Sequence, residues 1–189
     1  MLHSWSGTNI EVRKFRVTPL GLDLNILIIT PEGVTLNWKF MTQDPKRELL
    51  RHLVATIAFR GNVAVREAPA EFAGYRVAED TRTPGEILAH IGDLLEGSLY
   101  LLKGEMVYLN ADPLPWDQEV ARFFAVAKGL DSFLASDTVL AVPIEQLTQG
   151  PIADALTHIG QIIILRRAAG IPVKTEPYFT AEIVPGIFD

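Results

Sequence analysis

The strongest constraint on the fold is a helical period that starts at Asp44 and continues through most of the remaining sequence. Apolar residues recur there at spacings of three and four, the pattern of a helix that buries one face. Prolines and glycines divide this region into four such stretches. Because an amphipathic helix must bury its apolar stripe against another element, the pattern predicts an all-α fold, a four-helix bundle over residues 42–170.

The first two helices have clear start signals. Asp44 can cap the first helix, and the segment VAVREA could continue that helix to about Ala68. The tetrapeptide TPGE at residues 83–86 has the pattern of a capping box, in which the threonine and glutamate side chains each satisfy a backbone amide of the other. We expect this second helix to end at Gly104.

The third and fourth helices are predicted from their apolar stripes and their flanking breakers. The third is expected to run from about Trp116 to Ala135, and the fourth from near Gly150 to Gly170. The Pro-rich tail at residues 171–189 is expected to pack as an extended strap.

Residues 1–40 have a different character, because β-branched and aromatic residues dominate the segment LDLNILIITPEGVTLNWKF. The turn signal TPEG at residues 30–33 separates two apolar runs, so a β-hairpin over roughly 23–40 is the simplest interpretation. An alternative is that Met41 is the natural start and that the upstream stretch lies outside the native domain. The chain is therefore divided into an N-terminal extension, to which we assign no chemistry, and a bundle with its tail at residues 41–189.

Composition narrows the class of protein. The 189 residues are 48% hydrophobic, which is enough for a real core, and they carry a formal net charge of −6. An acidic chain argues against nucleic acid or an anionic membrane as the main partner. There is no cysteine, which excludes disulfides and thiolate ligands. No apolar run reaches the roughly 18 residues that span a bilayer, and the first residues do not resemble a signal peptide, so we expect a soluble, cytoplasmic protein.

Polar residues on two predicted helices are the candidates for chemistry. His90 falls at the edge of the second helix's apolar stripe, and Asp154 and His158 stand one turn apart on one face of the fourth, followed by Gln161. A polar stripe on an apolar helix needs partners if it is buried. One interpretation is structural, with Asp154 orienting His158 and His90 a hydrogen-bonded core histidine. The other joins all three as ligands of Zn(II), Fe(II), Ni(II) or Mn(II).

Three further residues are weaker candidates. His52 could face the same cavity as a catalytic group, although a surface or interface role on the first helix is the simpler interpretation. Glu119 could be a general base, and an exposed helix-pair role is the alternative. Arg166 could bind a substrate carboxylate, and capping the C-terminus of its helix is the alternative.

Three segments, TRTPGEILAHIGDLL, W-x-x-E-V-A-R-F-F and QGPIADALTHIGQIIILRRAAGIPV, resemble the DinB-like superfamily of metalloenzymes. The resemblance covers about residues 42–183. The last segment is the most specific, because it resembles a subgroup that carries THxGQ, LRR, a Gly-x-Pro and a tyrosine-containing tail such as the one at residues 176–179.

The resemblance implies a four-helix bundle, often a homodimer, with a metal between the second and fourth helices. In many relatives three histidines hold the metal, and His90 and His158 fall at the first and last of these positions. Asp154 stands at the middle position, which departs from the family pattern. A carboxylate can ligate a divalent metal, so the site either survives in altered form or has lost its ion.

Two classes of function follow. The first is a metal-dependent hydrolase or thiol-dependent transferase acting on a small molecule, with a low-molecular-weight thiol as co-substrate. In it Glu119 or His52 accepts a proton, and Gln161 and Arg166 contact the substrate. The second is a non-catalytic bundle that binds a small ligand or acts through dimerisation, with the metal site lost.

Overall fold

The chain divides into two compact units, residues 1–44 and 45–189, which are described separately. The computed structural model describes residues 11–15, 25–30, 33–36, 44–174 and 176–188.

The first unit contains a three-stranded antiparallel sheet in the order β1-β2-β3. The strands are β1 (Glu11–Phe15), β2 (Asn25–Thr30) and β3 (Gly33–Leu36). Strands β2 and β3 pair from Thr30 opposite Gly33 to Leu27 opposite Leu36, within the stretch where the sequence predicted a hairpin. Strand β1, which pairs with β2, was not predicted. Met41 and the remaining parts of the hairpin prediction lie outside the described residues.

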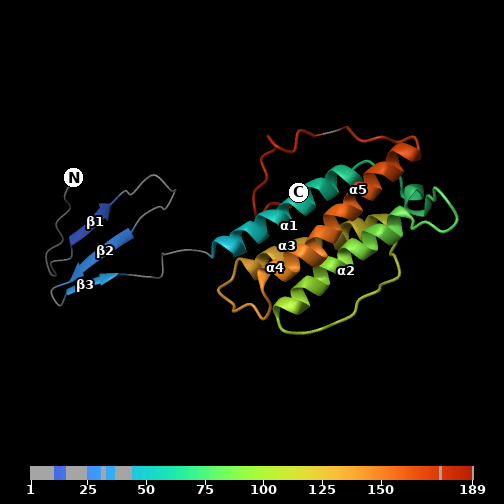
Figure 1. Cartoon of the computed structure of the whole chain (residues 1–189). Coiled ribbons are helices and arrows are strands. Elements are labelled where there is room, and N and C mark those ends of the chain that lie inside the picture. Colours follow the sequence, from blue (N-terminus) through green and yellow to red (C-terminus); the bar gives the residue numbers. More distant parts are fainter. Residues whose placement is uncertain (1–10, 16–24, 31–32, 37–43, 175, 189) are drawn as a thin grey trace. The chain divides into compact units, whose positions relative to one another are not determined.

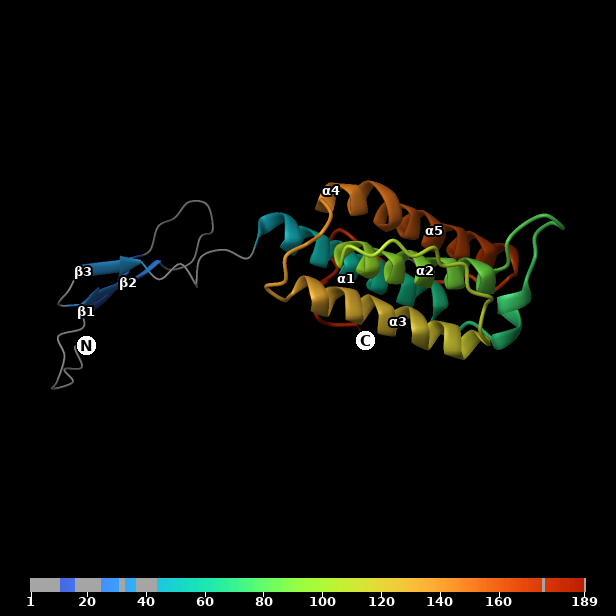
Figure 2. The ribbon, with the colours of Figure 1, turned by 90° about the horizontal axis from the view of Figure 1, so that it is seen from below.

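The second unit is all-helical over its described residues, as the sequence predicted. Its four long helices are α1 (Pro45–Val65), α2 (Pro84–Leu102), α3 (Trp116–Leu134) and α5 (Ala153–Ala168). Helices α1 and α2 each contact both α3 and α5, so the four enclose one shared core (Figures 1 and 2). The largest fully buried side chains of that core include Phe123, Leu50, Ile57, Leu88, Ile91 and Leu95.

Helix α2 starts as its sequence predicts. The hydroxyl of Thr83 accepts a hydrogen bond from the backbone N–H of Glu86 at 3.2 Å, and the Glu86 carboxylate accepts one from the N–H of Thr83 at 2.7 Å. Both halves of the capping box are therefore present, and the helix has a fixed first turn. Its end is also close to the prediction, since Gly104 adopts a φ of 82° two residues beyond Leu102.

Helix α1 ends earlier than predicted. It stops at Val65 rather than near Ala68, because Glu67 takes a positive φ of 57° that is incompatible with a right-handed helix. A short 3₁₀ helix, η2 (Ala70–Gly74), follows and was not predicted. It inserts the 3% exposed Phe72 into the core, where the ring meets Trp116 edge-on at 5.7 Å between centroids.

The fourth helix also differs from its prediction. A short α4 (Ile144–Leu147) and a π-helical turn, η3 (Thr148–Ile152), lead directly into α5 at Ala153. The predicted start near Gly150 falls inside this irregular turn. Pro151 has no N–H to continue the helical bonds, and Gly150 takes the non-helical angles φ −99° and ψ −107° that absorb the kink.

The C-terminal tail returns along α1, which agrees with the expected strap (Figure 1). Glu176 forms an ion pair with Arg66 at 2.6 Å. Further along, the ring of Tyr178 packs edge-on against Phe59, and the Arg60 guanidinium lies 4.2 Å from the centre of the same ring. Among the helices in the described ranges, none has both the length and the apolar character needed to cross a membrane.

Candidate metal centre

Helices α2 and α5 pack against each other and bring three ligand-type side chains together. His90 comes from the middle of α2, while Asp154 and His158 lie one turn apart on α5. Each can offer one donor atom, and these atoms all lie within 4.8 Å of one another. In the part of the chain that the structure describes, this is the group whose donors could share one ion.

The carboxylate of Asp154 faces both imidazoles. Its Oδ1 lies 3.3 Å from Nε2 of His158, and its Oδ2 lies 3.6 Å from Nε2 of His90. The two imidazole rings meet edge to face, with centroids 4.9 Å apart and an interplanar angle of 81°. Donors bound tetrahedrally to zinc at its usual bond lengths are about 3.4 Å apart. Both separations are close to that value, and one donor atom from each residue lies within 4.8 Å of the other two, so the arrangement is compatible with a shared divalent ion.

Gln161 fixes the orientation of the His158 ring. Its Oε1 lies 2.9 Å from Nδ1 of His158, one turn further along α5. The tautomer that donates from Nδ1 to this oxygen leaves Nε2 without a proton, facing the carboxylate of Asp154. Two lone pairs then oppose each other, and a cation between them would replace the repulsion by attraction. Metal-bound histidines are commonly oriented by such a second hydrogen bond.

The centre is partly open to solvent. The side chains of His90, Asp154 and His158 are 31%, 47% and 12% exposed. Burial, followed by the nearby charge of Arg82, lowers the pKa of His90, and the carboxylate of Asp154 acts in the opposite direction without reversing the shift. A lowered pKa keeps the His90 ring neutral near pH 7, which is the form that ligates metals.

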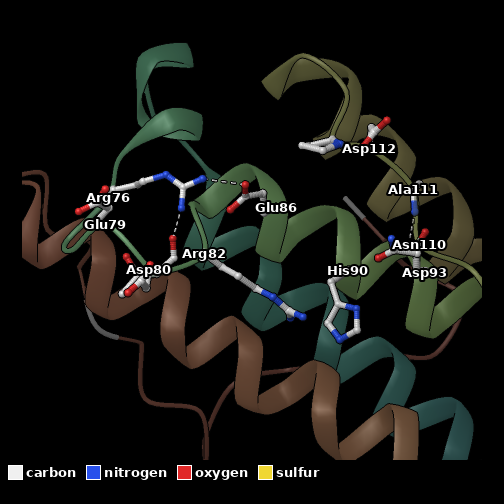
Figure 3. A pocket seen from close by; sticks show the side chains of 12 residues that line it. Arg76, Glu79, Asp80, Arg82, Glu86, His90, Asp93, Asn110, Ala111 and Asp112 are labelled. Atoms are coloured by element: carbon white, nitrogen blue, oxygen red, sulfur yellow. Dashed lines mark hydrogen bonds and ion pairs between the residues drawn. The ribbon is translucent and has the colours of Figure 1, made fainter.

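Two cavities adjoin the centre. A polar cavity of about 410 Å³ includes His90 in its wall, and an apolar one of about 460 Å³ includes His158 and Gln161. Arg82, from the loop before α2, lines both cavities. Figure 3 shows its side chain extending toward His90, whereas Arg76 reaches back to Glu86. The sequence did not single out Arg82, because its position before a capping box gives no signal of proximity to α5.

The structure does not bring His52 into this group. His52 lies on an exposed part of α1, where its backbone carbonyl accepts a hydrogen bond from the hydroxyl of Thr56. The surface interpretation is therefore the one that its placement supports.

Glu119 has a buried structural environment. Its side chain is 0% exposed; Oε2 accepts a hydrogen bond from the N–H of Leu114 at 2.9 Å, and Oε1 accepts one from Arg122 at 3.2 Å. Arg122 also binds Asp93 and Glu96 on α2. Glu119 thus belongs to an ion-pair network between α2 and α3, separate from the His90–Asp154–His158 group, and it is not the exposed partner that the sequence alternative described.

Arg166 is likewise occupied elsewhere. Its side chain is 4% exposed and donates hydrogen bonds to the backbone carbonyls of Ala64, Arg66 and Ile171. These contacts join the end of α1 to the segment after α5, so Arg166 binds carbonyls at the end of another helix rather than capping its own, as the sequence alternative described. Gln161, the other predicted substrate contact, lies beside His158 as described above.

Comparison with known proteins adds no assignment. No family model matches this chain, and no curated protein matches it either. The case for the centre therefore depends on the geometry of its residues.

Proposed function

We propose that His90, Asp154 and His158 bind a divalent metal ion, and that the chain is a metal-dependent enzyme of the DinB-like kind. The observation that carries the proposal is the convergence of three donors from α2 and α5 within 4.8 Å. The reaction class is hydrolysis or thiol-dependent transfer on a small molecule, with a low-molecular-weight thiol as co-substrate. The resemblance in the three sequence segments also implies a homodimer.

The donor set restricts the ion. Two imidazoles and one carboxylate suit Zn(II), Fe(II), Ni(II) and Mn(II), and three protein ligands leave positions open for water or substrate. Such an ion lowers the pKa of a bound water or thiol and so supplies a nucleophile near neutral pH. The chain's own contribution is to keep His90 neutral through burial and to align the His158 ring through Gln161.

Metal analysis of the purified chain tests the proposal. We expect about one equivalent of a divalent ion, and we expect His90→Ala and His158→Ala to lose it. His52→Ala is the matched control, because His52 is an exposed histidine on α1 and should leave the metal content unchanged. Adding ion at about 100 times its Kd should stabilise the native state by about 2.7 kcal/mol. The proposal would be refuted if the purified protein contains no metal and its thermal unfolding midpoint does not change when any of the four ions is added.

A non-catalytic bundle is the second candidate. It is favoured by the apolar cavity beside α5 and by Asp154, the carboxylate where many relatives have a third histidine. In this case the three side chains form a hydrogen-bonded cluster that supports a binding cavity. The same metal analysis separates the candidates, since this one predicts that His90→Ala leaves the response to added ions unchanged.

A further inference from the structure

We infer that the apolar cavity beside α5 binds a small monocarboxylate with an apolar chain, and that the Arg82 guanidinium binds the carboxylate. This inference rests on the proposed function in one respect, namely that the ligand is the substrate of the metal centre. Binding itself requires only the cavity and Arg82.

The walls of the cavity select for an apolar body. Its apolar lining comes from Val77, Ile87, Ile164 and Leu165. Ile164 is 63% exposed, so a large hydrophobic side chain would stay in water unless something covers it. A volume of about 460 Å³ falls in the usual range for small-molecule sites. An aliphatic or aromatic chain placed here would bury apolar area that the protein alone leaves exposed.

The charges that line the two cavities favour binding of an anion in the apolar cavity rather than in the polar one. The polar cavity on the His90 side is lined by two arginines, Arg76 and Arg82, and by five carboxylate residues: Glu79, Asp80, Glu86, Asp93 and Asp112. The apolar cavity has no acidic residue among its lining side chains, and Arg82 is its one formal charge. A carboxylate is therefore repelled on one side of Arg82 and attracted on the other.

Arg82 is available for such a ligand. Among the described residues it has neither a hydrogen bond nor an ion pair, whereas Arg76 on the same loop binds Glu86 at 2.9 Å. Its side chain extends toward His90 (Figure 3), and its charge is close enough to influence that ring. A free guanidinium presents two parallel N–H donors that match the oxygens of a carboxylate.

The position of the carboxylate would place the ligand at the metal centre. His158 and Gln161 line the same cavity as Arg82, so a carboxylate on Arg82 would share that cavity with a ligand of the metal centre. The apolar chain then extends toward Ile164 and Leu165. A two-point contact of this kind orients a substrate before any chemistry.

A pair of matched probes tests the inference. Octanoate and octanamide have the same chain and nearly the same shape, but octanamide carries no charge. We expect the full-length chain to bind octanoate about tenfold more tightly than octanamide in calorimetric titrations, since a charge-assisted bidentate contact is lost with the amide. Arg82→Gln should abolish this preference by weakening octanoate alone. Ile164→Gln should weaken both probes by similar factors.

Arg76→Gln is the control, because Arg76 is a neighbouring arginine that does not line the apolar cavity. This variant should prefer octanoate over octanamide to the same extent as the wild type. The metal content of every sample is measured in parallel. If Arg82→Gln keeps its metal and binds octanoate as the wild type does, the inference is overturned while the proposed function stands. If the wild-type chain holds no metal but its preference for octanoate over octanamide depends on Arg82, the binding site is supported and the proposed function is refuted.

Discussion

The imidazole rings of His90 and His158 meet edge to face, with their centroids 4.9 Å apart and their planes at 81°. The rings belong to α2 and α5, which pack along each other, so their approach is set by helix packing. A site built on helices is held more rigidly than one built on loops. Because the three side chains are partly exposed, substitutions at the centre should change ion binding with little effect on the core.

Asp154 should contribute strongly to ion affinity. Asp154→Asn keeps the shape of the side chain but removes the charge that faces both imidazoles at 3.3 and 3.6 Å. We expect the affinity for Zn(II) or Mn(II) to fall by at least about tenfold, measured by titration against a competing chelator. Affinity equal to the wild type would show that the carboxylate is not a ligand.

Asp154→His is an informative companion variant. It recreates the three-histidine set that the DinB-like resemblance implies. Imidazole suits Zn(II) and Ni(II), whereas carboxylate suits Mn(II). The variant should therefore raise the ratio of Zn(II) to Mn(II) affinity in the same titration, whereas Asp154→Asn should weaken both ions. An unchanged ratio would argue that position 154 does not reach the ion.

Local signals predicted the parts of this structure that depend on local interactions. The capping box at Thr83 and Glu86 could be read directly, since its two hydrogen bonds join residues three apart. The pairing of Asp154 with His158 also follows from helical spacing alone. The π-helical turn before α5 was missed, because a glycine and a proline indicate a helix start as readily as a kink within one.

Contacts with other parts of the fold determine the roles of several residues that could not be assigned from the sequence. The spacing of Glu119 and Arg122 permits their ion pair, but nothing in the sequence reveals the amide of Leu114 that also binds Glu119. Nor does it reveal the carbonyl groups that bind Arg166. Arg82 shows the converse case. It became a candidate only because the loop before α2 lies next to both cavities.

Glu86 should make the stability of α2 depend on pH. The hydrogen bond from the N–H of Thr83, followed by the charge of Arg76, lowers the pKa of Glu86 below its ordinary value of 4.5. A carboxylate with a lowered folded-state pKa stabilises the fold above the unfolded-state pKa, and this contribution is lost as the pH falls through the folded-state value. Glu86→Ala should therefore cost about 0.5–1 kcal/mol at pH 7 and progressively less below about pH 4.5.

Urea unfolding of the wild type and Glu86→Ala across this pH range checks the prediction. Thr83→Ala is the matched control, because it removes the other half of the box without removing a titrating group. The loss in unfolding free energy caused by Thr83→Ala should change less with pH than the loss caused by Glu86→Ala. A difference between wild type and Glu86→Ala that grows toward acid would contradict the sign given above.

Arg122 should be important for stability and dispensable for the metal. It binds Asp93 at 2.5 Å and the fully buried Glu119 at 3.2 Å, so Arg122→Met leaves buried carboxylates without their cation. Removing one partner of a buried ion pair costs about 3 kcal/mol or more. We expect that loss in urea unfolding, with the metal content unchanged. Arg76→Gln, which breaks an exposed pair with Glu86, should cost less than about 1 kcal/mol.

Gly61 allows the close approach of α1 to α3, and substituting it should be costly. A Cβ atom at this position would lie 2.6 Å from Cε1 of Phe123, a ring that is 0% exposed and would have to shift within the core. Gly61→Ala should therefore destabilise the fold by about 1–3 kcal/mol, despite the better helix propensity of alanine. Gly97→Ala on α2 is the matched control, because nothing lies within 4 Å of its Cβ position. That variant should gain about 0.5–1 kcal/mol in the same urea titration, and a gain for both variants would show that α1 and α3 do not pack this closely.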